Sequence, residues 1–192
     1  MALLDPQVLD GIRTLLEALG DDPNRPDLQA TPSRVLDSLR YLTRGQRESL
    51  EEVLEGGLFE GDYRDLVLVR DIEFASLCEH HLLPFLGHAH VAYVPDRRIL
   101  GLSKIARIVD HFAARLQVQE RLTTQVAECL TEVLRPRAVG VVISATHLCM
   151  QIRGVRKADS EVTTSVWRLG PQGGPEELER LRQELVASGT RR

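Results

Sequence analysis

The chain has 192 residues, of which 43% are hydrophobic, and a formal net charge of −4. This size suits one compact domain with an appendage, and the negative charge argues against a general nucleic-acid binder. We find no apolar run of the roughly 18 residues that a membrane span needs, and no basic region at residues 1–6 that would suggest a secretory signal. Three cysteines, an odd and sparse number, favour a reducing cytoplasm over a disulfide framework.

Residues 1–64 have the pattern of an N-terminal helical region. Apolar residues recur at helical spacing over 6–19, and the Thr-Pro pair at 31–32 has the N-cap and first-turn proline that open a second helix. A Ser-x-x-Glu capping box at 49–52 predicts a short third helix.

From residue 65 the pattern changes to β-rich stretches separated by helices. Strands are predicted over 66–74, 88–94, 139–145 and 162–167, and helices over 104–114, where Ser103 serves as the cap, and 118–134. This order predicts an α+β domain over 65–170, with an antiparallel four-stranded sheet and helices on one face. A glycine-rich break then leads to a polar helix over 175–186, within a C-terminal tail over 171–192.

Two segments at predicted strand ends carry residues that bind zinc. Cys78 and His81 form a local Cys-x-x-His pair after the first strand, and Cys149 follows the third strand. Zinc ligands often combine a local pair with a distant residue, and two thiolates plus one imidazole leave the fourth tetrahedral position for water. The pattern therefore predicts a catalytic zinc site made by these three residues.

The other histidines and the remaining cysteine divide into two groups. His80 and His147 each flank a predicted ligand, so each is a candidate proton shuttle or a partner that orients a ligand; the sequence does not separate these roles. Cys129 lies on the apolar stripe of a helix and is expected in the core, and His111, in mid-helix, is expected to be structural. His88 and His90 alternate on one strand and are expected to face solvent or a subunit neighbour.

Basic residues gather at two places that suit phosphate. Ser103, Lys104 and Arg107 lie at a predicted helix N-terminus, where backbone N–H groups and cations favour phosphate oxygens. Residues 153–157 form a second basic cluster. The alternative for the first is an ordinary solvated helix start. Glu120 begins the next helix and could accept two hydrogen bonds from the N1–H and 2-amino group of a guanine; the alternative is a surface charge that the helix dipole favours.

Taken together, these segments resemble the GTP cyclohydrolase I family. The motifs that carry the resemblance are residues 70–85 (RDIEFASLCEHHLLPF), 101–107 (GLSKIAR), 117–122 (QVQERL), 147–150 (HLCM) and 153–155 (RGV). They occur in the family's order across residues 31–170, whereas 1–30 and 171–192 match poorly.

The resemblance implies an activity and an assembly. Residues 65–170 would be a catalytic domain with the tunnelling fold (T-fold), assembled as a homodecamer of two stacked pentamers with active sites at subunit junctions. The enzyme would use Zn²⁺ to convert GTP and water into formate and 7,8-dihydroneopterin triphosphate, the first step of tetrahydrofolate or other pterin biosynthesis.

The resemblance also assigns roles to single residues. It implies that Cys78, His81 and Cys149 bind zinc and that His147 exchanges protons with the imidazole ring of the purine. The remaining roles are Ser103 and His80 along the ribose, Gln119 and a buried Glu120 at the guanine, Lys104, Arg107 and Arg153 at the triphosphate, and Arg34 reaching a neighbouring subunit's triphosphate. Asp37 departs from the family pattern, which has a lysine there, and Glu79 has no expected role.

Two other classes of function stay open at this point. One is a different enzyme on the same fold: a pterin synthase would need a three-histidine zinc site, and a nitrile reductase would need a nucleophilic cysteine without a second thiolate ligand. The other is a zinc-stabilised oligomer that binds nucleotide as a regulator and has no catalytic activity.

Overall fold

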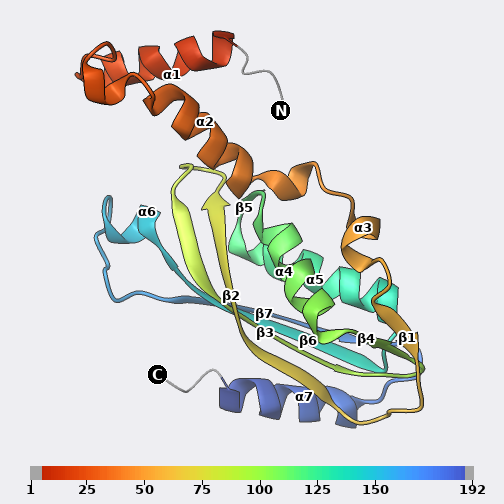
Figure 1. The fold of residues 1–192 in the computed structure, drawn as a ribbon. Helices are drawn as coiled ribbons and strands as arrows, with labels where there is room; N and C mark the ends of the chain where they lie inside the picture. The colour runs from red at the N-terminus through yellow and green to blue at the C-terminus, as the bar shows by residue number, and fades with distance from the viewer. Residues whose placement is uncertain (1–5, 189–192) are drawn as a thin grey trace. The chain divides into compact units, whose positions relative to one another are not determined.

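A computed structural model describes residues 6–188 of the chain (Figure 1). The chain forms two compact units, Met1–Thr43 and Arg44–Arg192. The domain boundaries expected at residues 64 and 170 stay a prediction. Among the described residues, no helix is long and apolar enough to cross a bilayer.

The first unit contains α1 (Pro6–Ala18), a single 3₁₀ turn (Pro26–Leu28) and α2 (Thr31–Leu42). The predicted start of α2 is confirmed, but Thr31 is its first helical residue, and the cap residue Ala30 makes no side-chain hydrogen bond. The apolar stripe of α1 stays largely open to solvent: Val8 is 41% exposed and Leu15 is 56% exposed.

The second unit begins with a 3₁₀ turn (Arg44–Gln46) and the short helix α3 (Leu50–Leu54). The predicted cap of α3 is confirmed, because Oγ of Ser49 accepts a hydrogen bond from the backbone N–H of Glu52. Two short strands, β1 (Leu58–Glu60) and β4 (Arg98–Leu100), then pair with each other in a small antiparallel sheet that the sequence did not predict.

The main sheet holds the four predicted strands and one more. β2 (Val67–Cys78), β3 (Pro84–Val94), β6 (Ala138–His147) and β7 (Val162–Leu169) pair antiparallel in that order. β5 (Leu116–Gln117) adds to the free edge of β2 in parallel. The expected four-stranded, purely antiparallel sheet therefore lacks the parallel strand β5. The sequence did not predict β5, because a two-residue strand is too short to show any periodicity.

Helices cover both faces of this sheet, so the prediction of helices on one face is wrong. α4 (Leu102–Ala113) and α5 (Gln119–Leu134) enclose the main core on one face, and α7 (Pro175–Ser188) lies on the other (Figure 1). Leu181 and Leu185 of α7 are fully buried there. The apolar positions of α7 are few, but their spacing places them on one side of the helix.

Strand register brings the two predicted zinc segments to the same end of the sheet. β2 passes through a tight hairpin into β3, and β3 pairs with β6 so that Phe85 lies opposite His147. The hairpin after Cys78 and the short helix α6 (Leu148–Gln151), which follows His147, therefore lie beside each other.

Candidate metal centre

The hairpin after β2 folds His81 back towards Cys78. The carbonyl oxygen of Cys78 accepts hydrogen bonds from the backbone N–H groups of His81 (3.3 Å) and Leu82 (2.8 Å), and the N–H of Cys78 donates to the oxygen of Leu83 (2.9 Å). Leu82 closes the turn with a left-handed backbone (φ 53°). As a result, Sγ of Cys78 lies 3.6 Å from Nδ1 of His81.

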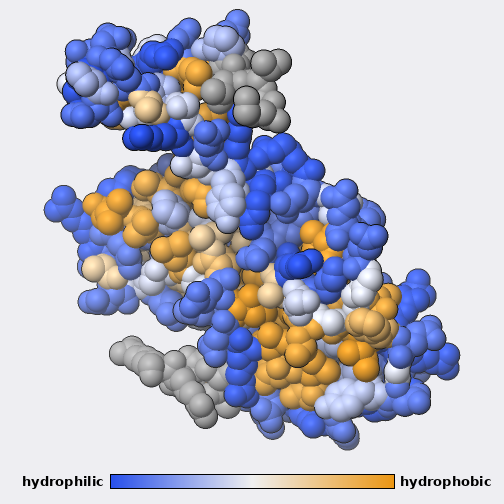
Figure 2. Space-filling view, viewed as in Figure 1, coloured by the Kyte–Doolittle hydropathy of each residue, from blue (hydrophilic) through white to orange (hydrophobic). Residues whose placement is uncertain are grey.

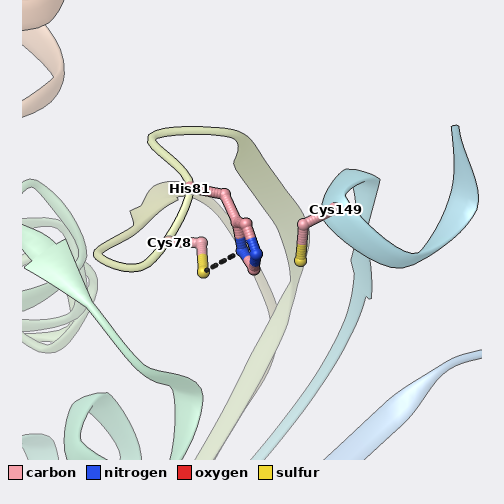
Figure 3. A group of neighbouring side chains, drawn as sticks. All are labelled: Cys78, His81 and Cys149. Atoms are coloured by element: carbon pink, nitrogen blue, oxygen red, sulfur yellow. Dashed lines mark hydrogen bonds between the residues drawn. The ribbon is translucent and has the colours of Figure 1, made fainter. Parts of the chain in front are cut away.

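Cys149 completes a group of three donors from the other side. It lies in α6, and its thiol, that of Cys78 and a ring nitrogen of His81 are all within 4.8 Å of one another. The three side chains point towards a common centre (Figure 3). A tetrahedral zinc ion with these donors holds its ligand atoms roughly 3.5–3.8 Å apart, so small side-chain movements suffice to fit the ion.

The thiols differ in their surroundings, and the difference separates candidate ligands from a core residue. Burial raises the pKa of the Cys149 thiol, and the neighbouring Cys78 raises it further. A divalent cation between them would supply the opposite charge that stabilises thiolates. Cys129 instead packs in the core on α5, where burial raises its pKa to about 12. Its predicted core position is confirmed.

His147 directly precedes the helix that carries Cys149, and two contacts hold its ring. Its ring stacks on Phe85, with centroids 4.6 Å apart and an interplanar angle of 1°. Its Nε2 lies 2.8 Å from Oε1 of Gln119. The Gln119 amide nitrogen donates to the carbonyl oxygens of Ile143 (3.0 Å) and Val162 (2.8 Å). Since both amide hydrogens are engaged, Oε1 must accept from His147, and Nε2 of that histidine carries the proton.

The charge state of His147 follows from the same surroundings. Burial lowers the pKa of His147, and the nearby carboxylate of Glu120 opposes that shift. The ring is therefore neutral near pH 7, with a proton on Nε2 and a lone pair on Nδ1. A neutral imidazole with one defined basic nitrogen is suited to proton exchange with a ligand.

The structure gathers some of the predicted site residues around this centre. His80 lies in the hairpin, with Nδ1 4.0 Å from Sγ of Cys78 and a side chain that is 64% exposed. Gln119 is buried, whereas Glu120, expected to be buried, is exposed in the single chain. In the first turn of α5 the side chain of Gln119 is buried, whereas that of Glu120 is on the solvent side of the helix. Arg153 follows α6, and its charge lowers the pKa of Cys149.

The other predicted phosphate residues make their contacts away from the centre. Gly101 is the N-cap residue of α4, so Ser103 lies inside the helix and not at its cap. Nζ of Lys104 donates to the carbonyl oxygen of Val53 (2.9 Å), and Arg107 lines a hollow of about 280 Å³ between α3 and α4. Among the described residues, no hydrogen bond or ion pair joins Ser103, Lys104 or Arg107 to the metal-centre residues, and Arg34 belongs to the other compact unit.

Sequence reasoning missed two partners of the site. Phe85 stacks on His147, and Arg121 pairs with the carboxylate of Glu79. Phe85 is visible in the sequence only as an apolar residue after Pro84, and its contact depends on the register between β3 and β6. Arg121 is one of many charged helix residues, so no spacing rule distinguishes it.

These features define a class of protein: an α+β fold with a candidate centre of two cysteines and one histidine, and with a second histidine fixed beside it. A sequence model of the family described as GTP cyclohydrolase I matches residues 9–187. A protein of Gloeobacter violaceus named GTP cyclohydrolase 1 is 57% identical over 162 residues, which are 84% of this chain and 75% of that one. The chain belongs to the GTP cyclohydrolase I family.

Other similar proteins include one from another bacterium and one solved structure. A Campylobacter jejuni protein named GTP cyclohydrolase 1 is 53% identical over 159 residues, which are 83% of this chain and 84% of that one. The crystal structure of the archaeosine synthase QueF-Like in the apo form covers 60% of this chain and 100% of its own, with 17% identity and a TM-score of 0.45.

Proposed function

We propose that this protein is a zinc-dependent GTP cyclohydrolase I, which converts GTP and water into formate and 7,8-dihydroneopterin triphosphate. This reaction is the first step of tetrahydrofolate or other pterin biosynthesis. The observation that carries the proposal is the convergence of Cys78, His81 and Cys149 beside the fixed ring of His147, in a member of this family.

Cys78, His81 and Cys149 would hold the zinc ion through two thiolates and one imidazole. Bound there, zinc supplies a Lewis acid that lowers the pKa of water towards neutrality. Opening the five-membered ring of guanine requires a water oxygen at C8 and a proton at N7. Nε2 of His147 is engaged by Gln119, so its free Nδ1 would accept a proton from the attacking water and deliver it to N7. The water that releases formate would pass a proton to the departing nitrogen by the same route.

The remaining residues recognise the substrate. Glu120 would accept hydrogen bonds from the N1–H and 2-amino group of guanine, and Lys104, Arg107 and Arg153 would bind the triphosphate. Ser103 and His80 would lie along the ribose, which must rearrange before the second ring closes. The hydrogen bonds of Gln119 favour a role in positioning His147 over direct contact with guanine.

The exposure of Glu120 supports a site that a neighbouring subunit completes. An exposed carboxylate selects guanine weakly, because water replaces the lost hydrogen bonds, whereas a buried one left unpaired costs roughly 1–3 kcal/mol. We propose that this unit has the tunnelling fold and assembles into a decamer of two pentamers, with Arg34 of one subunit reaching the triphosphate of the next. The three free cysteines suit a cytoplasmic protein.

Exposed apolar side chains near the centre are consistent with such an assembly. Leu82 (51% exposed) and Leu86 (46%) lie on the β2–β3 hairpin, and Ile152 (62%) and Val155 (63%) follow α6. Apolar surface gathers over this end of the second unit (Figure 2). Contiguous exposed apolar surface commonly marks a contact with another protein.

A turnover assay with zinc analysis tests the proposed function. Protein purified with its metal should release formate from GTP and form a fluorescent pterin. Cys149→Ser should lose both zinc and turnover, because one of the three donors is gone. Cys129→Ala is the matched control, since it removes a core thiol on α5 that is not one of the three donors; it should keep both. Absence of formate from the zinc-loaded protein, or full zinc occupancy in Cys149→Ser, would contradict the proposal.

A further inference from the structure

Glu79 has no role in the proposed reaction, although it lies between two residues of the candidate site. It follows the donor Cys78 and precedes His80 in the hairpin. Its carboxylate forms an ion pair with the guanidinium of Arg121, and its other oxygen lies 3.8 Å from Nε2 of His80. Both members of the ion pair are partly exposed, Glu79 by 32% and Arg121 by 44%.

Arg121 connects the start of α5 to the hairpin. It lies in the first turn of α5, directly after Gln119 and Glu120. Its Nε donates to Oε1 of Gln117 (3.1 Å) and its Nη2 also donates to the carbonyl oxygen of Leu116 (3.3 Å). The guanidinium therefore has several acceptors with fixed directions, which restricts it more than a single surface ion pair would.

Gln117 joins the same network to the core. Only 1% of it is exposed, and its amide donates to the carbonyl oxygen of Phe112 (2.9 Å) and to Oε1 of Gln125 (2.7 Å). The backbone carbonyl oxygen of Gln117 accepts a hydrogen bond from the backbone N–H of Glu79 (2.9 Å). The hairpin is thus tied to β5 through its backbone and to α5 through the side chain of Glu79.

We propose that Glu79 and Arg121 are positioning residues, which hold the hairpin with Cys78 and His81 at a fixed place relative to the start of α5. These two elements would contact opposite ends of the substrate's base. The hairpin carries donors of the metal centre, and the start of α5 carries Glu120, which would bind the guanine edge. A displacement of about 1 Å between such groups can lower a rate about 100-fold. The catalytic part of this inference rests on the proposed function, whereas the part that concerns metal retention does not.

The ion pair acts on the site and not on overall stability. Isolated exposed pairs contribute only about 0–1 kcal/mol to folding. Groups that orient metal ligands from outside have larger local effects, and their loss commonly weakens metal binding about 10–100-fold. Loss of the ion pair should therefore change zinc retention and turnover with little change in the thermal unfolding midpoint.

A double-mutant cycle with Glu79→Gln, Arg121→Gln and the double variant tests this role in the zinc-loaded, full-length protein. Three quantities are measured: the rate of zinc release to a chelator, kcat and KM for GTP, and the thermal unfolding midpoint. Each single variant should release zinc about 10-fold faster and lose about 10-fold in kcat, with a smaller change in KM. The double variant should resemble either single one, because both remove the same interaction.

Two further variants keep the result interpretable. Asp96→Asn removes the ion pair with Arg64, which is similarly exposed and lies at the β3–β4 turn; it should match the wild type in zinc release and kcat. Arg121→Lys keeps the charge and should recover part of both, and it replaces Arg121→Gln in the cycle if that variant does not fold. Single variants within twofold of the wild type, or losses that multiply in the double variant, would overturn the inference. A wild type that forms no formate would overturn the proposed function, and the zinc-release cycle would still decide the positioning role.

Discussion

Gln119 determines which nitrogen of His147 carries a proton. Its amide hydrogens are directed to the carbonyl oxygens of Ile143 and Val162, so its oxygen faces His147 and must accept. An isolated imidazole exchanges its proton between the two nitrogens, and only one of these forms can exchange a proton with substrate through Nδ1. Under the proposed mechanism, Gln119 would therefore control the reaction through the position and tautomer of His147.

Replacement of Gln119 with methionine should separate positioning from guanine binding. Methionine fills a similar volume without an acceptor for Nε2 of His147. We expect kcat to fall roughly 10–100-fold, since general acid–base catalysis contributes at least that much, while KM for GTP changes little. Nitrogen NMR of His147 should show the Nε2–H form in the wild type and a mixture in the variant. A variant whose KM rises while kcat is kept would show that Gln119 contacts guanine instead.

For single residues, the sequence predicted the zinc donors better than the contacts that hold His147. Cys78, His81 and Cys149 were recognised because zinc chemistry restricts residue type and spacing, and the structure brings all three together. The contacts of His147 with Phe85 and Gln119 depend on the pairing of β3 with β6 and on the start of α5. No local pattern encodes those distances, so they could not be predicted.

The C-terminal helix α7 is a structural part of the sheet domain, although its sequence suggested a polar tail. Its apolar residues Leu178, Leu181 and Leu185 lie on one side among glutamates and arginines. Gly140 on β6 leaves room for them, because a Cβ at that position would lie 2.6 Å from the ring of Trp167 and 3.0 Å from Leu185. The low overall hydropathy of α7 made its narrow apolar face hard to recognise in the sequence.

Truncation of Leu185 should therefore destabilise the protein substantially. Leu185→Ala should lower the free energy of unfolding by about 2–5 kcal/mol, as expected for a fully buried leucine. Val186→Ala is the matched control, because that side chain is 66% exposed, and it should change stability by less than about 0.5 kcal/mol. Urea unfolding monitored by circular dichroism gives both values. Equal stability of the two variants would show that α7 does not pack on the sheet in solution.

Helices of several turns and strands with several alternating residues were predicted from the sequence, and very short strands were not. The long strands and the helices α4 and α5 appear where periodicity indicated them. β5, with two residues, and β1 and β4, with three each, contain too few positions for any period to show. Their pairing is decided by neighbouring strands, and β5 is the element that carries Gln117 next to the hairpin.

For the molecule as a whole, the order of elements predicted the α+β class, but not the strand β5, the small β1–β4 sheet or the helix on the second face of the main sheet. The two segments with zinc donors are about 70 residues apart along the chain, and antiparallel pairing of β3 with β6 brings them together. The segments share an end of the sheet because β3 pairs antiparallel with both β2 and β6. Under the proposed assembly, a neighbouring subunit would cover Glu120, which is exposed in the single chain.

Buried histidines should make the stability of the whole molecule depend on pH in the mildly acidic range. Burial lowers the pKa of His90, His111 and His147 below the ordinary value of 6.5. Between that value and the lowered ones, the unfolded chain binds protons that the folded chain does not. The stability that these groups contribute is thus complete above about pH 6.5 and falls as the pH decreases, with a slope of up to about 1.4 kcal/mol per pH unit for each histidine.

His90 allows one of these contributions to be isolated. Its Nδ1 accepts the backbone N–H of Asp71 (3.2 Å), and asparagine can present an acceptor at nearly the same place without binding a proton. The groups that face it are Asp71, which opposes the lowered pKa, and His88 and Arg70, which reinforce it. Urea unfolding from pH 7.5 to 5.5, under identical zinc conditions, should show a shallower loss of stability in His90→Asn than in the wild type. Because both proteins share every other titrating group, parallel curves would mean that His90 is protonated equally in the folded and unfolded states.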